Sequence, residues 1–219
     1  MAERVVSLID VDNTLLDNDA AKVEIGRRLL ALLGEAGTAA FWVAYEVVRA
    51  DLGVVDIPRA IHQALPPGNS LERRVALADL FMQFPFADYI YPGALETIAW
   101  LQTFGPVVIL SDGDPVFQPN KINRAGLASA VDGHVLVYTH KEEHLIEIAA
   151  AFPADRYLLI EDKPSVIERL TARADELGAP LQTVLVRQGK YAAAVGAGTF
   201  AAATWTCSTI ADVRSVPIL

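Results

Sequence analysis

Five short, nearly all-apolar runs recur along the chain and limit the folds open to it. They occupy residues 5–9, 107–110, 135–138, 157–160 and 184–186. Strands buried on both faces of a parallel sheet have this composition, whereas strands with one solvated face alternate apolar and polar residues. Apolar residues at helical spacing precede the second and fourth runs. The order predicts an α/β fold, with a Rossmann-like parallel sheet, helices on both faces and right-handed crossovers.

The first two runs are much farther apart than a single crossover helix requires. Residues 20–84 of this interval carry apolar residues at helical spacing, and Tyr91-Pro92-Gly93 marks a return to the sheet. We therefore expect an inserted helical cap domain at residues 18–90. Residues 1–17 and 91–219 then form the α/β core domain.

Composition and cysteine content favour a cytoplasmic protein. A chain of 219 residues, 53% of them hydrophobic, can bury a core without disulfides. Its single cysteine, Cys207, cannot form an internal disulfide, which favours a reducing compartment. The first apolar run is too short for a signal-peptide core. The alanine-rich stretch at 191–205 is too weakly apolar for a membrane span, and we expect it to form loop and helix.

The net charge of the chain limits the kinds of partner that we expect it to bind. A formal net charge of -9 disfavours a broad nucleic-acid surface, which needs clustered lysine and arginine. We therefore expect a small-molecule ligand, held by a local pocket, and neither a nucleic-acid nor a membrane partner. The sequence leaves open whether the protein is a monomer or a homodimer.

Polar residues gather directly after four of the apolar runs. These segments are Asp10-Val11-Asp12-Asn13-Thr14, Ser111-Asp112-Gly113-Asp114, Thr139-His140-Lys141 and Glu161-Asp162-Lys163. Because ligands bind beyond the carboxyl ends of parallel strands, the four segments are expected to converge on one crevice. Each segment alone also has a structural explanation. Asp and Asn favour turns, Lys141 fits a solvated first turn of a helix, and Asp162 could cap the helix that follows it.

In their order and spacing these segments resemble the haloacid dehalogenase-like (HAD) hydrolase superfamily. Its pattern is an Asp-x-Asp-x-Thr loop, a Ser or Thr after the second core strand, a downstream Lys, and an acidic pair near the fourth strand. "DVDNT", Ser111, Lys141 and the pair at 161–162 match in order. There are two departures. Asn13 stands where the family commonly has glycine. The last motif reads Glu161-Asp162, where Asp-Asp or Gly-Asp is commoner in the family.

The resemblance implies a phosphatase that acts on a phosphorylated small molecule. Asp10 would attack phosphorus and form an aspartyl-phosphate, and Asp12 would act as general acid and then general base. Mg²⁺ would bind the carboxylates of Asp10 and Asp162 and the backbone carbonyl of Asp12. Lys141 would neutralise Asp10 and a phosphate oxygen. Lys121 is a second candidate for that role.

The remaining motif residues would hold the phosphate or support the metal. The resemblance gives phosphate contacts to the hydroxyls of Thr14 and Ser111 and to backbone N–H groups near Asn13 and Asp112. It makes Glu161 an indirect or water-mediated metal ligand.

Three other functions stay open on the sequence. A 2-haloacid dehalogenase has the same fold but lacks the second aspartate and the metal, so Asp12 and Asp162 count against it. A phosphomutase keeps Asp12 and differs in what accepts the phosphoryl group. A non-catalytic scaffold would not need all four motif positions filled. We therefore expect an enzyme, a HAD-like hydrolase of phosphoric monoesters.

Overall fold

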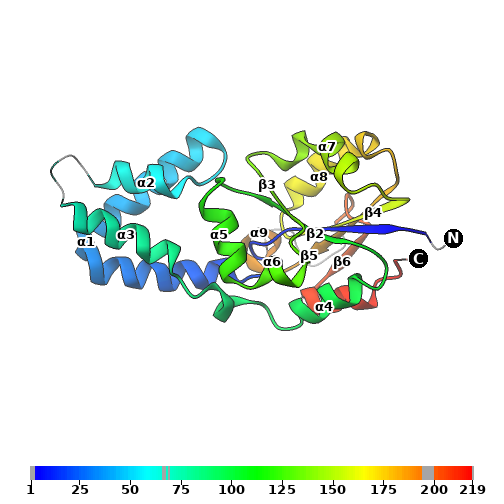
Figure 1. The fold of residues 1–219 in the computed structure, drawn as a ribbon, viewed down its shortest axis with the longest axis horizontal. Helices are drawn as coiled ribbons and strands as arrows, with labels where there is room; N and C mark the ends of the chain where they lie inside the picture. The colour runs from blue at the N-terminus through cyan, green and yellow to red at the C-terminus, as the bar shows by residue number, and fades with distance from the viewer. Residues whose placement is uncertain (1–2, 66–67, 69, 194–199, 219) are drawn as a thin grey trace.

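The core of the protein is a parallel sheet (Figure 1). The computed structural model describes residues 3–65, 68, 70–193 and 200–218. Within these residues the sheet has six strands in the order β3-β2-β1-β4-β5-β6, and every pair is parallel. Their bounds are β1 Val5–Ile9, β2 Val107–Asp112, β3 Val135–Tyr138, β4 Arg156–Glu161, β5 Leu181–Val186 and β6 Trp205–Cys207. The predicted Rossmann-like α/β fold is confirmed.

Five strands coincide with the five apolar runs, and the sixth was not expected. The expectation of loop and helix for 191–205 is wrong at Trp205, where β6 begins. β6 is only three residues long and pairs with β5 alone, so no apolar run marks it. Helix α9 (Gly189–Ala193) covers the start of that stretch, while residues 194–199 lie outside the described part.

Helices cover both faces of the sheet. Alternate strand residues point to opposite sides, and because they are apolar on both sides, each face is buried against helices. Val5 and Ile9 of β1 belong to one buried cluster, and Val6 and Leu8 belong to the other. The first cluster includes residues from α4 (Ala94–Leu101), α5 (Phe117–Arg124), α6 (Leu127–Ala130) and η4 (Ile210–Ser215). The second includes residues from α7 (Leu145–Ala151), α8 (Pro164–Ala172) and η3 (Ala174–Leu177).

A helical cap is inserted between β1 and β2, as the sequence predicted. It comprises α1 (Asn18–Leu52), α2 (Ile57–Ala64), α3 (Leu71–Met82) and the short η1 (Phe86–Tyr89). α1 bends at Gly34, whose φ of 70° lies in the left-handed region that glycine adopts without strain. Phe41 and Phe81 stack with ring centroids 5.2 Å apart and join α1 to α3. The exact domain bounds, 18 and 90, stay a prediction.

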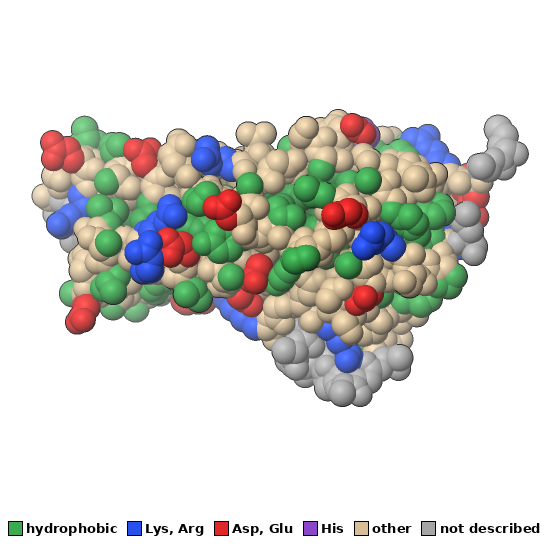
Figure 2. Space-filling model, turned by 90° about the horizontal axis from the view of Figure 1, so that it is seen from below, with side chains coloured by type: hydrophobic (Ala, Val, Ile, Leu, Met, Phe, Trp, Pro, Cys, Tyr) green, Lys and Arg blue, Asp and Glu red, His purple; other side chains and the backbone are tan. Residues whose placement is uncertain are grey.

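The cap and the two chain ends lie at opposite ends of an elongated molecule (Figure 1). On the described part of the face in Figure 2, Lys and Arg side chains stand in small groups beside Asp and Glu rather than in one basic patch. Among the helices that the structure describes, none is long and apolar enough to cross a bilayer.

Candidate active site

A buried lysine binds two carboxylates at the ends of the central strands. Lys141 begins η2 (Lys141–Glu143), and its Nζ donates to Asp10 Oδ1 at 2.8 Å and to Glu161 Oε2 at 2.6 Å. It also donates to the carbonyl of Leu110 at 3.2 Å. The Lys141 side chain is 1% exposed, so its charge is balanced by these carboxylates and not by water.

Asp10, Glu161 and Asp162 form an acidic cluster that could hold a metal ion. One oxygen from each carboxylate lies within 4.8 Å of the others. Among the described residues, Asp10 Oδ2 and both Asp162 oxygens have no hydrogen-bond partner although they are buried. Burial, and next the negative charge of Glu161, raise the pKa of Asp10 to about 6 and that of Asp162 to about 10. Buried carboxylate oxygens without a partner fit a cation site.

Asp162 does not cap helix α8, so this alternative explanation of the residue is wrong. Lys163 occupies the N-cap position, and α8 has no side-chain cap hydrogen bond. Glu161 Oε1 accepts the backbone N–H of Lys163 at 3.0 Å. Both oxygens of Glu161 therefore have donors, whereas Asp162 keeps both of its oxygens for another partner.

A second buried lysine binds the second aspartate of the motif. Lys121 Nζ donates to both oxygens of Asp12, at 2.7 and 2.9 Å, and to Asn18 Oδ1 at 3.2 Å. Burial alone would raise the pKa of Asp12, but the charge and hydrogen bond of Lys121 hold it below its ordinary value. Of the two candidate lysines, Lys141 therefore binds Asp10, and Lys121 binds Asp12.

The loop after β1 has a conformation that explains one departure from the family pattern. Asn13 has a φ of 63°, in the left-handed region where glycine and asparagine are the residues tolerated best. Its Oδ1 accepts the N–H of Asp19 at 3.2 Å, which joins the loop to the start of α1. Thr14 Oγ1 is buried and has no hydrogen-bond partner among the described residues.

The end of β2 supplies the other two residues expected at the phosphate. Ser111 is 1% exposed, and its Oγ accepts from Gln118 Nε2 at 2.9 Å, so its own proton stays available for donation. Asp112 Oδ1 accepts the backbone N–H of Lys141 at 2.8 Å. Asp112 thereby fixes the start of η2, from which Lys141 reaches Asp10.

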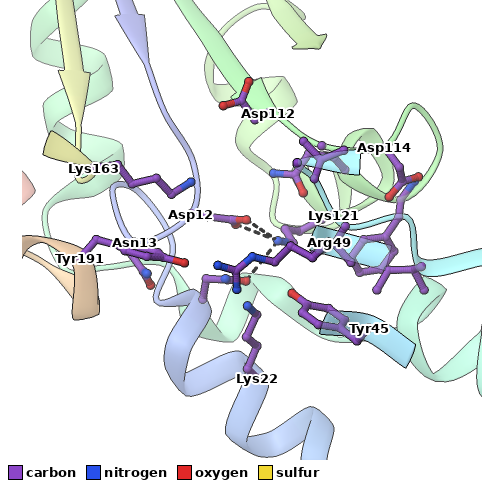
Figure 3. A pocket seen from close by; sticks show the side chains of 18 of the residues that line it. Asp12, Asn13, Lys22, Tyr45, Arg49, Asp112, Asp114, Lys121, Lys163 and Tyr191 are labelled. Carbon is purple, nitrogen blue, oxygen red and sulfur yellow. Dashed lines mark hydrogen bonds and ion pairs between the residues drawn. The ribbon is translucent and has the colours of Figure 1, made fainter. Parts of the chain in front are cut away.

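A cavity of about 580 Å³ lies between the core and the cap (Figure 3). Asp12, Asn13 and Asp112 line it on the core side, so three of the predicted site residues face it. Several residues to which the sequence assigned no role share this space. They are Lys163, Gln118 and Asp114 from the core and Asn18, Lys22, Trp42, Tyr45 and Arg49 from α1. Lys163 and Asp114 belong to polar segments that directly follow strands, and this position is the sequence signal that indicates them.

Comparison with protein families decides the classification. The family model described as a haloacid dehalogenase-like hydrolase matches residues 6–184. The chain belongs to this hydrolase family. No curated protein sequence matches it. The solved structure of a haloacid dehalogenase-like hydrolase from Burkholderia xenovorans LB400 has 34% identity and a TM-score of 0.87, covering 98% of this chain and 97% of that chain.

More distant members of the HAD family share the fold. The magnesium-bound HAD hydrolase YfnB from Bacillus subtilis has 15% identity and a TM-score of 0.64, with 100% of both chains covered. L-2-haloacid dehalogenase from Xanthobacter autotrophicus has 18% identity and a TM-score of 0.58, with 98% of both chains covered. At these identities the likeness concerns the fold and does not identify the reaction.

Proposed function

We propose that the protein is a Mg²⁺-dependent phosphatase that hydrolyses a small phosphomonoester through an aspartyl-phosphate on Asp10. One observation carries the proposal. The two carboxylates that follow β1 have separate partners. Asp10 binds Lys141 and belongs to the acidic cluster, whereas Asp12 binds Lys121 and lines the cavity. Hydrolysis in two steps needs such a pair, a nucleophile and a separate group that moves the proton.

In the first step Asp10 attacks phosphorus while the bond from phosphorus to the leaving oxygen breaks. Lys141 holds Asp10 Oδ1 at 2.8 Å and thereby orients the carboxylate. Asp12 gives its proton to the leaving oxygen. A phosphate that enters beside Asp12 disfavours its ionised form, which helps Asp12 to take up that proton despite Lys121. In the second step Asp12 takes the proton from water, which attacks phosphorus and frees Asp10 and inorganic phosphate.

Mg²⁺ is the cation that this site would take. The carboxylates of Asp10 and Asp162, with the backbone carbonyl of Asp12, would hold it, and few protein ligands with added waters suit Mg²⁺. When bound, it would neutralise the charge that builds up on the phosphoryl oxygens. Glu161 would support the site indirectly, because both of its oxygens already accept hydrogen bonds from Lys141 and Lys163.

The phosphate would be held by the residues around the cluster. Ser111 and Thr14 supply hydroxyls, and backbone N–H groups near Asn13 and Asp112 supply further donors. Lys163 is an addition to this set, because it lines the cavity and its positive charge opposes the rise in the pKa of Asp10 that burial causes.

Asp162 argues against the dehalogenase alternative. A halide leaves without a proton and without a metal, so that reaction requires neither Asp12 as a proton donor nor a cation at the partnerless oxygens of Asp162. A phosphomutase would use the same residues and differ in the phosphoryl acceptor. A scaffold would gain nothing from the two buried lysine–carboxylate pairs, which cost desolvation energy.

The test is release of phosphate from p-nitrophenyl phosphate and from a panel of phosphorylated metabolites, with Mg²⁺ or with EDTA. We expect release with Mg²⁺ and none with EDTA. Halide release from chloroacetate in EDTA, without any phosphate release, would overturn the proposal in favour of a dehalogenase.

Asp12→Asn is expected to slow hydrolysis more for alkyl phosphates than for p-nitrophenyl phosphate. General acid catalysis contributes about 10²–10⁴-fold, and an alkoxide needs the proton while p-nitrophenolate leaves readily without it. The measurement is kcat/KM for both esters in the wild type and the variant. Equal losses for the two esters would show that Asp12 does not protonate the leaving group.

Mg²⁺ is expected to raise the melting temperature more at about pH 8 than at about pH 5. Without the metal, the folded state keeps protons on Asp10, pKa about 6, and Asp162, pKa about 10, that the unfolded chain releases near the ordinary value of 3.8. These two groups therefore lower stability as the pH rises above that value. Mg²⁺ must displace the protons, so its affinity rises with pH.

Thermal unfolding with and without Mg²⁺ at both pH values checks this expectation. Asp162→Asn removes one ligand and should abolish most of the shift. A shift of equal size at both pH values, or one retained in Asp162→Asn, would place the metal elsewhere.

A further inference from the structure

The lysines of this chain are concentrated at one place. The chain has five lysines and a net charge of -9. Four of them line the cavity, and the fifth, Lys141, donates a hydrogen bond to Asp10. The four are Lys22, Lys121, Lys163 and Lys190. With Arg49 and Arg169, six cations line the cavity against the five carboxylates of Asp12, Asp19, Asp112, Asp114 and Glu142, so this part of an acidic protein favours anionic ligands.

Three of the five lysines already have a role at the proposed reaction site. Lys141 neutralises Asp10 and Glu161, and Lys121 neutralises Asp12. Lys163 lines the cavity, and Figure 3 shows its charged end pointing toward Asp12, on the side where the phosphate would bind. A single phosphomonoester with Mg²⁺ requires no further cations.

Two more cations reach the cavity from the cap. Lys22 and Arg49 both belong to α1, and Figure 3 shows their charged ends pointing into the same part of the cavity. In that view Asp12 lies between them and Lys163. Since Asp12 would protonate the leaving oxygen, Lys22 and Arg49 lie where the leaving group extends from the phosphate toward the cap.

The partners of these two cations leave them able to bind a ligand. Lys22 Nζ lies 5.1 Å from the ring centroid of Tyr45, and it forms no ion pair with a carboxylate of the described residues. Arg49 contacts Glu46 at 3.2 Å, but the Glu46 side chain is 62% exposed. Exposed pairs of this kind contribute little free energy, so a ligand anion can replace Glu46. Trp42 and Tyr45 line the cavity beside them and supply an apolar wall.

We propose that the leaving group of the substrate carries a second anionic group, a carboxylate or a second phosphate, that binds Lys22 and Arg49. This inference rests on the proposed phosphatase function. The planar guanidinium of Arg49 can bind either oxyanion through two hydrogen bonds, and Lys22 adds a point charge. The cavity volume of about 580 Å³ suits a small metabolite with a charge at each end.

The first test uses the wild-type protein alone. Hydrolysis of p-nitrophenyl phosphate with Mg²⁺ is measured against three inhibitors of matched length: propylphosphonate, 3-phosphonopropionate and propane-1,3-bisphosphonate. We expect the second anion to lower the inhibition constant by roughly 10-fold or more, the scale of charge-assisted hydrogen bonds. Whether the carboxylate or the second phosphonate inhibits better distinguishes the two anions. Equal inhibition by all three compounds would overturn the inference.

Variants then test whether the two cap residues are responsible. Lys22→Met and Arg49→Met should each reduce the preference for the doubly charged inhibitors by roughly 10-fold. Arg27→Met is the matched control, because Arg27 lies on the same helix, is 69% exposed and pairs with Glu24 outside the cavity. The control should keep the preference. An unchanged preference in Lys22→Met and Arg49→Met would overturn the assignment.

The outcomes separate the inference from the proposed function. If the wild type hydrolyses no phosphomonoester, the phosphatase proposal fails. If it hydrolyses p-nitrophenyl phosphate but does not distinguish the three phosphonates, only the second anion site fails.

Discussion

Asp10→Asn is expected to lower Mg²⁺-dependent hydrolysis of phosphomonoesters by about 10⁴-fold or more, the largest effect on activity of any single change here. An amide oxygen is a poor nucleophile and cannot form the aspartyl-phosphate. The substitution keeps the shape of the side chain and an acceptor for Lys141, which donates to Asp10 Oδ1 at 2.8 Å. The loss should therefore appear in kcat while the protein stays folded.

The measurement is phosphate release by the wild type and by Asp10→Asn, purified in the same way and checked by circular dichroism. Asp79→Asn is the control, since Asp79 is an exposed residue of α3 outside the cavity. It should retain wild-type activity. An Asp10→Asn protein with more than a tenth of wild-type activity would exclude Asp10 as the nucleophile.

Lys141→Met is expected to have the largest effect on stability, lowering the free energy of unfolding by about 3–5 kcal/mol. The side chains of Lys141, Asp10 and Glu161 are 1%, 3% and 0% exposed. Removing the lysine leaves the acidic cluster buried without its cation, and neither water nor salt can compensate there. Phosphatase activity should be lost as well, because Asp10 is no longer held in place.

Urea unfolding in EDTA measures this effect without a contribution from bound metal. The deficit should shrink at low pH, because protonation removes the charge of Asp10 and Glu161. Lys190→Met removes the same charge from an exposed side chain and should leave stability nearly unchanged. A deficit below about 1 kcal/mol for Lys141→Met would mean that the ion pairs do not balance the buried carboxylates.

The sheet could be predicted because its central strands are buried on both faces. Each of the five apolar runs became a strand. Four of these strands have buried residues between two layers of helices, and β3 is a half-buried edge strand whose four apolar residues pack partly against both clusters. β6 could not be predicted, because its residues Trp205–Cys207 lie at the edge and pair with β5 only. A short edge strand is determined by tertiary pairing and leaves little trace in the sequence.

The sequence predicted which strand ends form the site, because the topology of the sheet determines that. It did not predict which side chains pair there, because that depends on how the surrounding helices pack. Parallel strands β1, β2 and β4 bring Asp10, Ser111 and Asp162 to one edge, as expected. Sequence order favoured Lys141 over Lys121 as the partner of Asp10, but it did not indicate that Lys121 binds Asp12, because that contact depends on how α5 packs. The cap residues at the cavity could not be assigned, since their direction depends on how α1 packs.

Trapping the covalent intermediate tests the central claim most directly. The wild type is mixed with p-nitrophenyl phosphate and Mg²⁺ and quenched with borohydride, which reduces an aspartyl-phosphate to homoserine. Peptide mass spectrometry then identifies the modified residue. We expect homoserine at position 10, dependent on both substrate and Mg²⁺ and absent from Asp10→Asn. Turnover of the substrate without modification at Asp10, or with modification at another carboxylate, would contradict the proposed mechanism.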